Sequence, residues 1–227
     1  MQAKTDAAAA ETASLLNSFG MELGAGGLVV MTDFAKAESA YIHHSRVPVA
    51  VVAMALASPT FARGRFPKLR LVDVVTKAPS MDGIEQRALA AVCGANIDSL
   101  PEGSSRAPAF AAHLLDVIAR YELNPFFTRV PDRAVNGIDV RPRGIDWRTE
   151  QVDADEMREW RRRYKALPPV RQMMVATIIW LYRGGERDKS WLARLPSTWL
   201  AADAVAALLE AGALRDWGRL IAMYPGW

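Results

Sequence analysis

Apolar residues recur at helical spacing along most of the chain, and this pattern predicts a mostly α-helical, compact protein. The clearest stripe contains Phe110, Leu114 and Ile118, in a helix expected to have Pro108 at its first position. The other predicted helices lie at about 3–17, 32–44, 49–57, 82–92, 153–167, 199–211 and 217–224. Both halves of the chain are therefore expected to be helical.

Polar residues at the ends of these stretches sharpen the prediction. Asp82 followed by Glu85 is typical of a capping box, and Gly94 suits the left-handed stop of the same helix. Asp153 or Asp155 would cap the next clear helix, which should end at Pro168-Pro169. The helix near 199–211 would be capped by Ser197 or Thr198.

Residues 170–182 allow two structures. Pro169 favours a helical start, whereas the run from Thr177 to Tyr182 has strand propensity and would form a hairpin with residues 190–195. The helix is the favoured interpretation and gives a mostly α fold. The alternative, a small β-hairpin in the C-terminal part, would make the fold α+β.

Tryptophan and turn-forming residues divide the chain into four parts. All seven tryptophans follow Asp146. Residues 124–150 are rich in Pro, Arg, Asn and Gly, and predict a long connection that serves as a hinge or binds a partner. We therefore expect a flexible, peripheral segment at 1–30, a helical part at 31–123, this connection, and a Trp-rich part at 151–227. Met31 is an alternative candidate for the first residue of the native protein.

The composition is that of an ordinary globular protein and indicates no particular activity. The chain has 227 residues, 51% of them hydrophobic, and a formal net charge of +3. Asp6 and Glu11 interrupt the apolar N-terminus, and the longest apolar runs are too short to span a bilayer, so we expect a cytoplasmic protein without membrane insertion. The single cysteine, Cys93, lies in an apolar helical pattern and is expected to be a small buried hydrophobe.

The sequence carries no catalytic or metal-binding motif. Adjacent residues on a helix point about 100° apart, so His43 and His44 cannot chelate one ion as a pair four residues apart would. No nucleophile elbow and no phosphate-binding loop is present. We therefore expect no catalytic residue, no metal and no cofactor. An enzyme would require a cleft that gathers distant polar residues such as His44, His113 and Asp203.

Arginine and tryptophan supply the candidate interaction surface. Trp, Tyr and Arg are the residues that most often anchor protein interfaces. The candidate partner-binding residues are Arg158, Arg161, Arg162, Arg163, Trp191, Arg194, Trp199, Trp217 and Trp227. The alternative is that the tryptophans form a hydrophobic core and that the arginines form a solvated helix face complementing the helix dipole.

The C-terminal segment, residues 178–227, resembles the end of plasmid fertility inhibition factors. The resemblance rests on four stretches: Trp-Leu-Tyr-Arg-Gly-Gly at 180–185, Trp-x-x-Arg-Leu-Pro at 191–196, Ala-Ala-Asp-Ala at 201–204, and the final Tyr-Pro-Gly-Trp. Members of this family are small cytosolic proteins encoded on conjugative plasmids.

The resemblance implies a non-enzymatic inhibitor of the conjugative transfer of a co-resident plasmid. Its partner would be a protein of the transfer machinery, the coupling ATPase of the type IV secretion system. Arg161, Arg162 and Arg163 would then form a steering patch. The alternative function is a plasmid-borne regulator that binds nucleic acid, although a net charge of +3 supports this only weakly.

Overall fold

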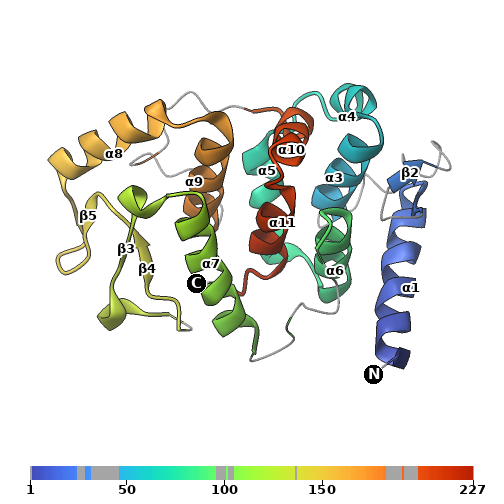
Figure 1. The fold of residues 1–227 in the computed structure, drawn as a ribbon, viewed down its shortest axis with the longest axis horizontal. Coiled ribbons are helices and arrows are strands. Elements are labelled where there is room, and N and C mark those ends of the chain that lie inside the picture. The colour runs from blue at the N-terminus through green and yellow to red at the C-terminus, as the bar shows by residue number, and fades with distance from the viewer. Residues whose placement is uncertain are drawn as a thin grey trace.

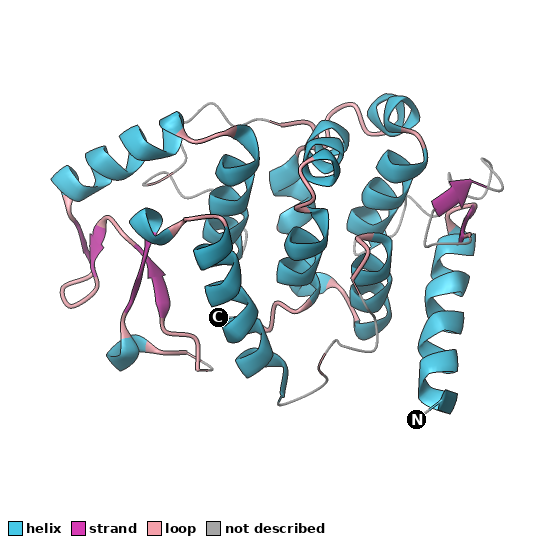
Figure 2. Cartoon of the chain, viewed as in Figure 1, coloured by secondary structure: helices cyan, strands magenta, loops and turns pink. Residues whose placement is uncertain are grey.

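Helices α1, α3, α6, α11, α7 and α9 stand side by side along the length of the molecule, and α8 lies across them at the end opposite α1 (Figure 1). The computed structural model describes residues 2–24, 29–31, 46–95, 101, 105–135, 137–182, 191 and 199–226. The strands form only two-stranded antiparallel sheets in this part of the chain (Figure 2). The prediction of a mostly α fold is confirmed.

The helices are α1 (Gln2–Ser18), α3 (Val47–Ala57), α4 (Pro59–Arg65), α5 (Leu71–Val75), α6 (Gly83–Val92), α7 (Arg106–Arg120), α8 (Ala154–Ala166), α9 (Pro169–Tyr182), α10 (Ala201–Glu210) and α11 (Leu214–Ala222). The short 3-10 turns are η3 (Ala78–Ser80), η6 (Asn124–Phe126) and η7 (Pro131–Arg133). The strands are β1 (Met21–Leu23), β2 (Val29–Met31), β3 (Phe127–Arg129), β4 (Val140–Pro142), β5 (Ile145–Asp146) and β6 (Gln151–Val152).

The predicted caps of α6 are present. The Asp82 carboxylate accepts hydrogen bonds from the backbone N–H groups of Ile84, at 2.8 Å, and Glu85, at 2.9 Å. The Glu85 carboxylate accepts one in return from the Asp82 N–H at 3.0 Å, which completes the capping box. Gly94 follows the helix with a φ of 78°, the left-handed conformation that glycine adopts without strain.

The ambiguous segment after Pro168 is a helix. α9 runs from Pro169 to Tyr182, and its residues from Met173 to Leu181 are buried. Tertiary packing on the core explains why β-branched and aromatic residues are helical here. The proposed hairpin partner, 190–195, lies outside the described residues apart from Trp191.

The connection at 124–150 is folded. β3 pairs antiparallel with β4, with Thr128 opposite Arg141, and β5 pairs with β6. This stretch is fixed to the core because Phe126, Phe127 and Val140 are buried. Small hairpins are thus present in the C-terminal half, but they lie at 127–142 and 145–152.

The predicted starts of α7 and α10 need adjustment. α7 begins at Arg106, so Pro108 occupies its third position instead of its first. α10 begins at Ala201 with Leu200 as its N-cap residue, whereas Ser197 and Thr198 lie outside the described residues. The helix predicted at 32–44 also lies outside them.

The hydrophobic core draws on both halves of the chain. α3 is apolar on all sides and central, with Val47 to Ala55 buried. α11 packs against α6, α7 and α9, so the C-terminal helix lies among helices from earlier in the sequence. α1 stands at the edge of the molecule (Figure 1) yet packs on α6, and Leu16 and Phe19 near its end are fully buried. Within the described chain, no helix has the length and apolar character needed to cross a membrane.

Candidate functional site

Helix α8 presents one buried face and one charged face. Asp153 caps its first turn by accepting hydrogen bonds from the N–H groups of Asp155, at 3.0 Å, and Glu156, at 2.9 Å. Its buried residues are Met157, Trp160 and Tyr164. Because these apolar residues recur every three or four positions, Arg158, Arg162 and Arg163 are turned towards solvent.

The arginines of this face form ion pairs along their own helix. Arg158 binds Asp155 at 2.9 Å, while Arg162 and Arg163 bind the same carboxylate, Glu159, at 2.7 and 2.6 Å. Hydrogen bonds from Arg162 and then from Arg163 lower the pKa of Glu159 to about 2, so this carboxylate stays charged at all physiological pH values. The arginine side chains remain well exposed, at 78% for Arg158, 75% for Arg162 and 50% for Arg163.

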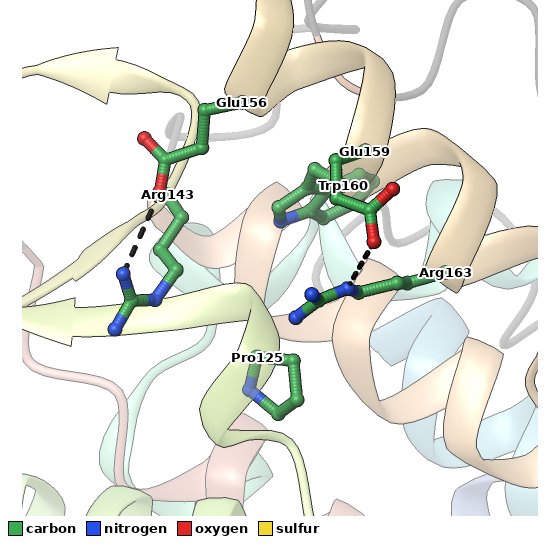
Figure 3. Close-up of a pocket in the computed structure, with 6 residues that line it drawn as sticks. All are labelled: Pro125, Arg143, Glu156, Glu159, Trp160 and Arg163. Atoms are coloured by element: carbon green, nitrogen blue, oxygen red, sulfur yellow. Dashed lines mark hydrogen bonds and ion pairs between the residues drawn. The ribbon is translucent and has the colours of Figure 1, made fainter.

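A cleft of about 350 Å³ opens beside this helix (Figure 3). It is lined by residues from η6, from the turn after β4, and from α8: Pro125, Arg143, Glu156, Glu159, Trp160 and Arg163. Arg143 and Arg163 stand on opposite sides of it, above Pro125 (Figure 3). Three segments that are distant in sequence therefore meet at one site.

An aromatic cluster holds the inner wall of the cleft rigid. The Trp160 ring lies 5.3 Å from the Phe126 ring, edge to face, and stacks on Tyr164 at 5.4 Å. The Trp160 indole also donates a hydrogen bond to the Phe126 carbonyl oxygen at 3.2 Å. These contacts fasten η6 to α8 and fix the distance between the two walls.

Arg143 is positioned by the turn between β4 and β5. Its Nε donates to the Phe127 carbonyl at 3.1 Å, and its Nη1 lies 3.5 Å from the Glu156 carboxylate. The next residue, Gly144, has a φ of 94° and donates its N–H to Glu156 at 3.2 Å. A Cβ at Gly144 would lie 2.8 Å from the methyl carbon at the end of the Met157 side chain. The positive φ is therefore the main reason that glycine suits this turn.

The predicted partner-binding residues fall into two groups. Arg158, Arg161, Arg162 and Arg163 lie on α8, where Arg161 is partly buried and the others are exposed. Trp191 and Trp217 are fully buried, with indole hydrogen bonds to the Arg143 carbonyl at 2.7 Å and to the Thr177 hydroxyl at 3.0 Å. Trp199 is partly buried, and Arg194 and Trp227 lie outside the described residues. Trp191 and Trp217 therefore support the core, as the alternative interpretation had it.

Sequence reasoning singled out only Arg163 among the residues that line the cleft. Pro125 and Arg143 lie in the connection at 124–150 that was expected to be a hinge or to bind a partner, but neither is singled out within it, and nothing in the sequence distinguishes Glu159. The Asn136-Gly137 dipeptide, a strong hairpin signal, could have shown that 127–142 folds back on itself. No sequence signal places that hairpin against α8.

The polar residues of the enzyme hypothesis are not brought together in the described structure. His113 lies on α7, with its Nε2 3.0 Å from the Asp216 carbonyl oxygen, whereas Asp203 accepts a hydrogen bond from Arg63 at 3.0 Å. His44 lies outside the described residues. Burial raises the pKa of the Cys93 thiol, which makes it a poor nucleophile. Among the described residues, no cluster of His, Cys, Asp and Glu has the makings of a metal site.

Comparisons of the chain with protein-family models, with curated proteins and with solved structures give no match. The site must therefore be interpreted from its own chemistry. It offers guanidinium groups on a rigid wall that is open to solvent, an arrangement suited to binding an acidic partner.

Proposed function

We propose that the protein is a plasmid-encoded fertility inhibition factor that suppresses conjugative transfer of a co-resident plasmid. It would act by binding a protein of the transfer machinery, the coupling ATPase. The resemblance of residues 178–227 to this family supplies the function class. The observation that carries the binding mode is the exposed arginine face of α8.

An inhibitor meets its partner by diffusion, and complementary charge speeds that encounter. Charged residues at the edge of an interface steer association and set specificity more than they add affinity. Arg158, Arg162 and Arg163 are at least half exposed on one rigid helix. An acidic surface of a partner would meet them without any rearrangement of the core.

A mating assay tests the proposal directly. Transfer of a co-resident conjugative plasmid is measured with and without this gene, and a marked fall in transfer frequency is expected when the protein is made. Undiminished transfer across several plasmid groups would defeat the proposal.

Replacing Arg161, Arg162 and Arg163 together by Ala should weaken inhibition by roughly tenfold, because steering by charge is lost. The melting temperature should change little, since the ion pairs of Arg162 and Arg163 lie on an exposed face and contribute little to stability. The matched control replaces Arg63, Arg65 and Lys68 by Ala, which removes the same charge from α4 and its following turn. Full inhibition by the α8 triple variant would show that this face is merely solvated.

The same variants separate protein binding from DNA binding. Asp155, Glu156 and Glu159 stand among the arginines of α8, and these carboxylates would repel a continuous phosphate backbone. Affinity for any DNA that fell steeply with salt, and that disappeared in the α8 triple variant, would favour the nucleic-acid regulator instead.

A further inference from the structure

We propose that the cleft between η6 and α8 binds the carboxylate side chain of an acidic segment in a partner protein. The inference rests on the proposed function for the choice of a protein as partner. Arg143 and Arg163 would bind this carboxylate.

Counting donors and acceptors shows what the cleft lacks. A guanidinium group carries five N–H donors and no acceptor. Within the described chain, the hydrogen bonds of Arg163 run through Nε to Glu159, and those of Arg143 run through Nε to the Phe127 carbonyl. The Nη atoms of Arg163 and the Nη2 atom of Arg143 therefore retain donor capacity on the two sides of the cleft (Figure 3).

The acceptors of the cleft are already engaged. Glu159 accepts from Arg162 Nε and Nη2, both at 2.7 Å, and from Arg163 Nε at 2.6 Å. Glu156 accepts from the Gly144 N–H and faces Arg143. Because the Nη atoms of Arg163 and the Nη2 atom of Arg143 have no acceptor in the described chain, a ligand that supplies acceptor oxygens suits the cleft best.

Charge and shape select a single carboxylate. Arg143 and Arg163 balance Glu156 and Glu159 in the cleft, and Arg162 adds one positive charge beside it. A carboxylate is planar and matches a guanidinium fork in a bidentate manner. A volume of about 350 Å³ accommodates one such side chain together with an apolar neighbour against Pro125 and Trp160. A phosphate backbone would instead be repelled by the carboxylates of α8, Asp155, Glu156 and Glu159.

The wall is preorganised for this contact. Arg143 is held by the Phe127 carbonyl, by Glu156, and by the turn at Gly144. Arg163 is held by Glu159 on a capped helix. Binding would therefore order few side chains, and ordering is a main cost of association.

The test is direct binding to the full chain. The probe is a fluorescein-labelled peptide of sequence Glu-Asp-Phe-Asp-Glu, and the comparison peptide is Gln-Asn-Phe-Asn-Gln. Fluorescence anisotropy should show binding of the acidic peptide at least about tenfold tighter than that of the amide peptide. Equal binding of the two peptides, or no binding of the acidic one, would overturn the inference.

Two substitutions locate the site. Arg143→Gln and Arg163→Gln should each weaken binding of the acidic peptide by roughly tenfold. Arg63→Gln, at an exposed position on α4 outside the cleft, should change it less than about twofold. Arg163→Lys keeps the charge but loses the planar fork, and it should lie between wild type and Arg163→Gln. Circular dichroism melts establish that each variant folds, and Arg163 is the safer site because its one bond is to an exposed partner.

Two outcomes would count against the cleft. Equal effects of Arg143→Gln, Arg163→Gln and Arg63→Gln would show that the peptide responds only to the overall charge of the protein. A labelled thymidine oligonucleotide that bound more tightly than the peptide, and lost binding in the cleft variants, would assign the site to nucleic acid. The mating assay is separate, because a wild-type protein that binds the peptide but leaves transfer unchanged refutes only the proposed function.

Discussion

Gly218 is the residue at which α11 comes closest to the end of α6. A Cβ built at Gly218 would lie 2.5 Å from the Cys93 sulfur and closer still to the Cys93 Cβ. Cys93 is itself buried beyond the last residue of α6. Two small residues, Gly218 and Cys93, therefore allow these helices to pack closely. The buried thiol fills the space between them, and a larger side chain would not fit there.

Replacing Gly218 by Ala should destabilise the protein by about 1–3 kcal/mol, because the added methyl group overpacks the contact with Cys93. Gly64→Ala is the matched control. Gly64 lies in α4 with open space around its Cα, so alanine there should stabilise the protein by about 0.5–1 kcal/mol through helix propensity. Urea unfolding of both variants measures the two free energies. Stabilisation by Gly218→Ala would show that the helices do not approach so closely.

The N-cap of helix α8 supports the candidate site. The cleft exists only if the first turn of α8 is formed, since Glu156 lies in that turn and orders both Gly144 and Arg143. The Asp153 carboxylate satisfies the N–H groups of Asp155 and Glu156 in the same turn. The end of one helix thus determines the geometry of one wall of the cleft.

Asp153→Ala should cost about 1 kcal/mol of unfolding free energy and loosen the start of α8, because two N–H groups lose their acceptor. Asp153→Asn keeps a capping oxygen and should cost less. Amide hydrogen exchange should rise at residues 155–157 in the alanine variant and stay slow in the asparagine variant. Equal exchange in the two would mean that the cap does not hold this turn.

Hydrogen bonds and an ion pair between residues far apart in the sequence hold α11 against α7. The Asp216 carboxylate accepts from Arg120 at 2.7 Å and from the Tyr121 hydroxyl at 3.0 Å, and its backbone carbonyl faces His113. Arg106 donates to the Ala222 and Met223 carbonyls at 2.8 and 3.2 Å. The last helix is thus held along its length by residues of the middle of the chain.

This contact makes stability depend on pH. Burial lowers the pKa of His113 below its ordinary value of 6.5, with Arg219 adding to the effect and Asp216 opposing it. The unfolded chain therefore binds more protons near pH 6, and the contribution of His113 is complete above about pH 7 and is lost as pH falls through its folded pKa. Urea unfolding should show stability falling between pH 7.5 and 5.5. His113→Gln, which can still donate to the carbonyl, should flatten that slope, and an unchanged slope would contradict the assignment.

Local signals were enough to predict most helices. Asp82, Glu85 and Gly94 satisfy their caps within a few residues, so the sequence alone specifies α6. Whether Trp191 and Trp217 belong to an interface or to the core is decided by the residues that their indoles contact, which lie 40 or more positions away in the sequence. The cleft was beyond prediction for the same reason: Arg143 meets α8 only because a hairpin with three-residue strands folds back upon it. Such short strands leave little alternation to detect.

The position of α11 has a consequence for how the protein folds during synthesis. Its side chains reach Arg120 and Tyr121, about a hundred residues earlier, and Thr177 across a shorter loop. Contacts of such high sequence separation slow folding, because long loops must close before they form. The apolar faces of α6, α7 and α9 consequently stay uncovered until α11 has emerged from the ribosome. A nascent chain of this protein is a natural client for chaperones that shield hydrophobic surface.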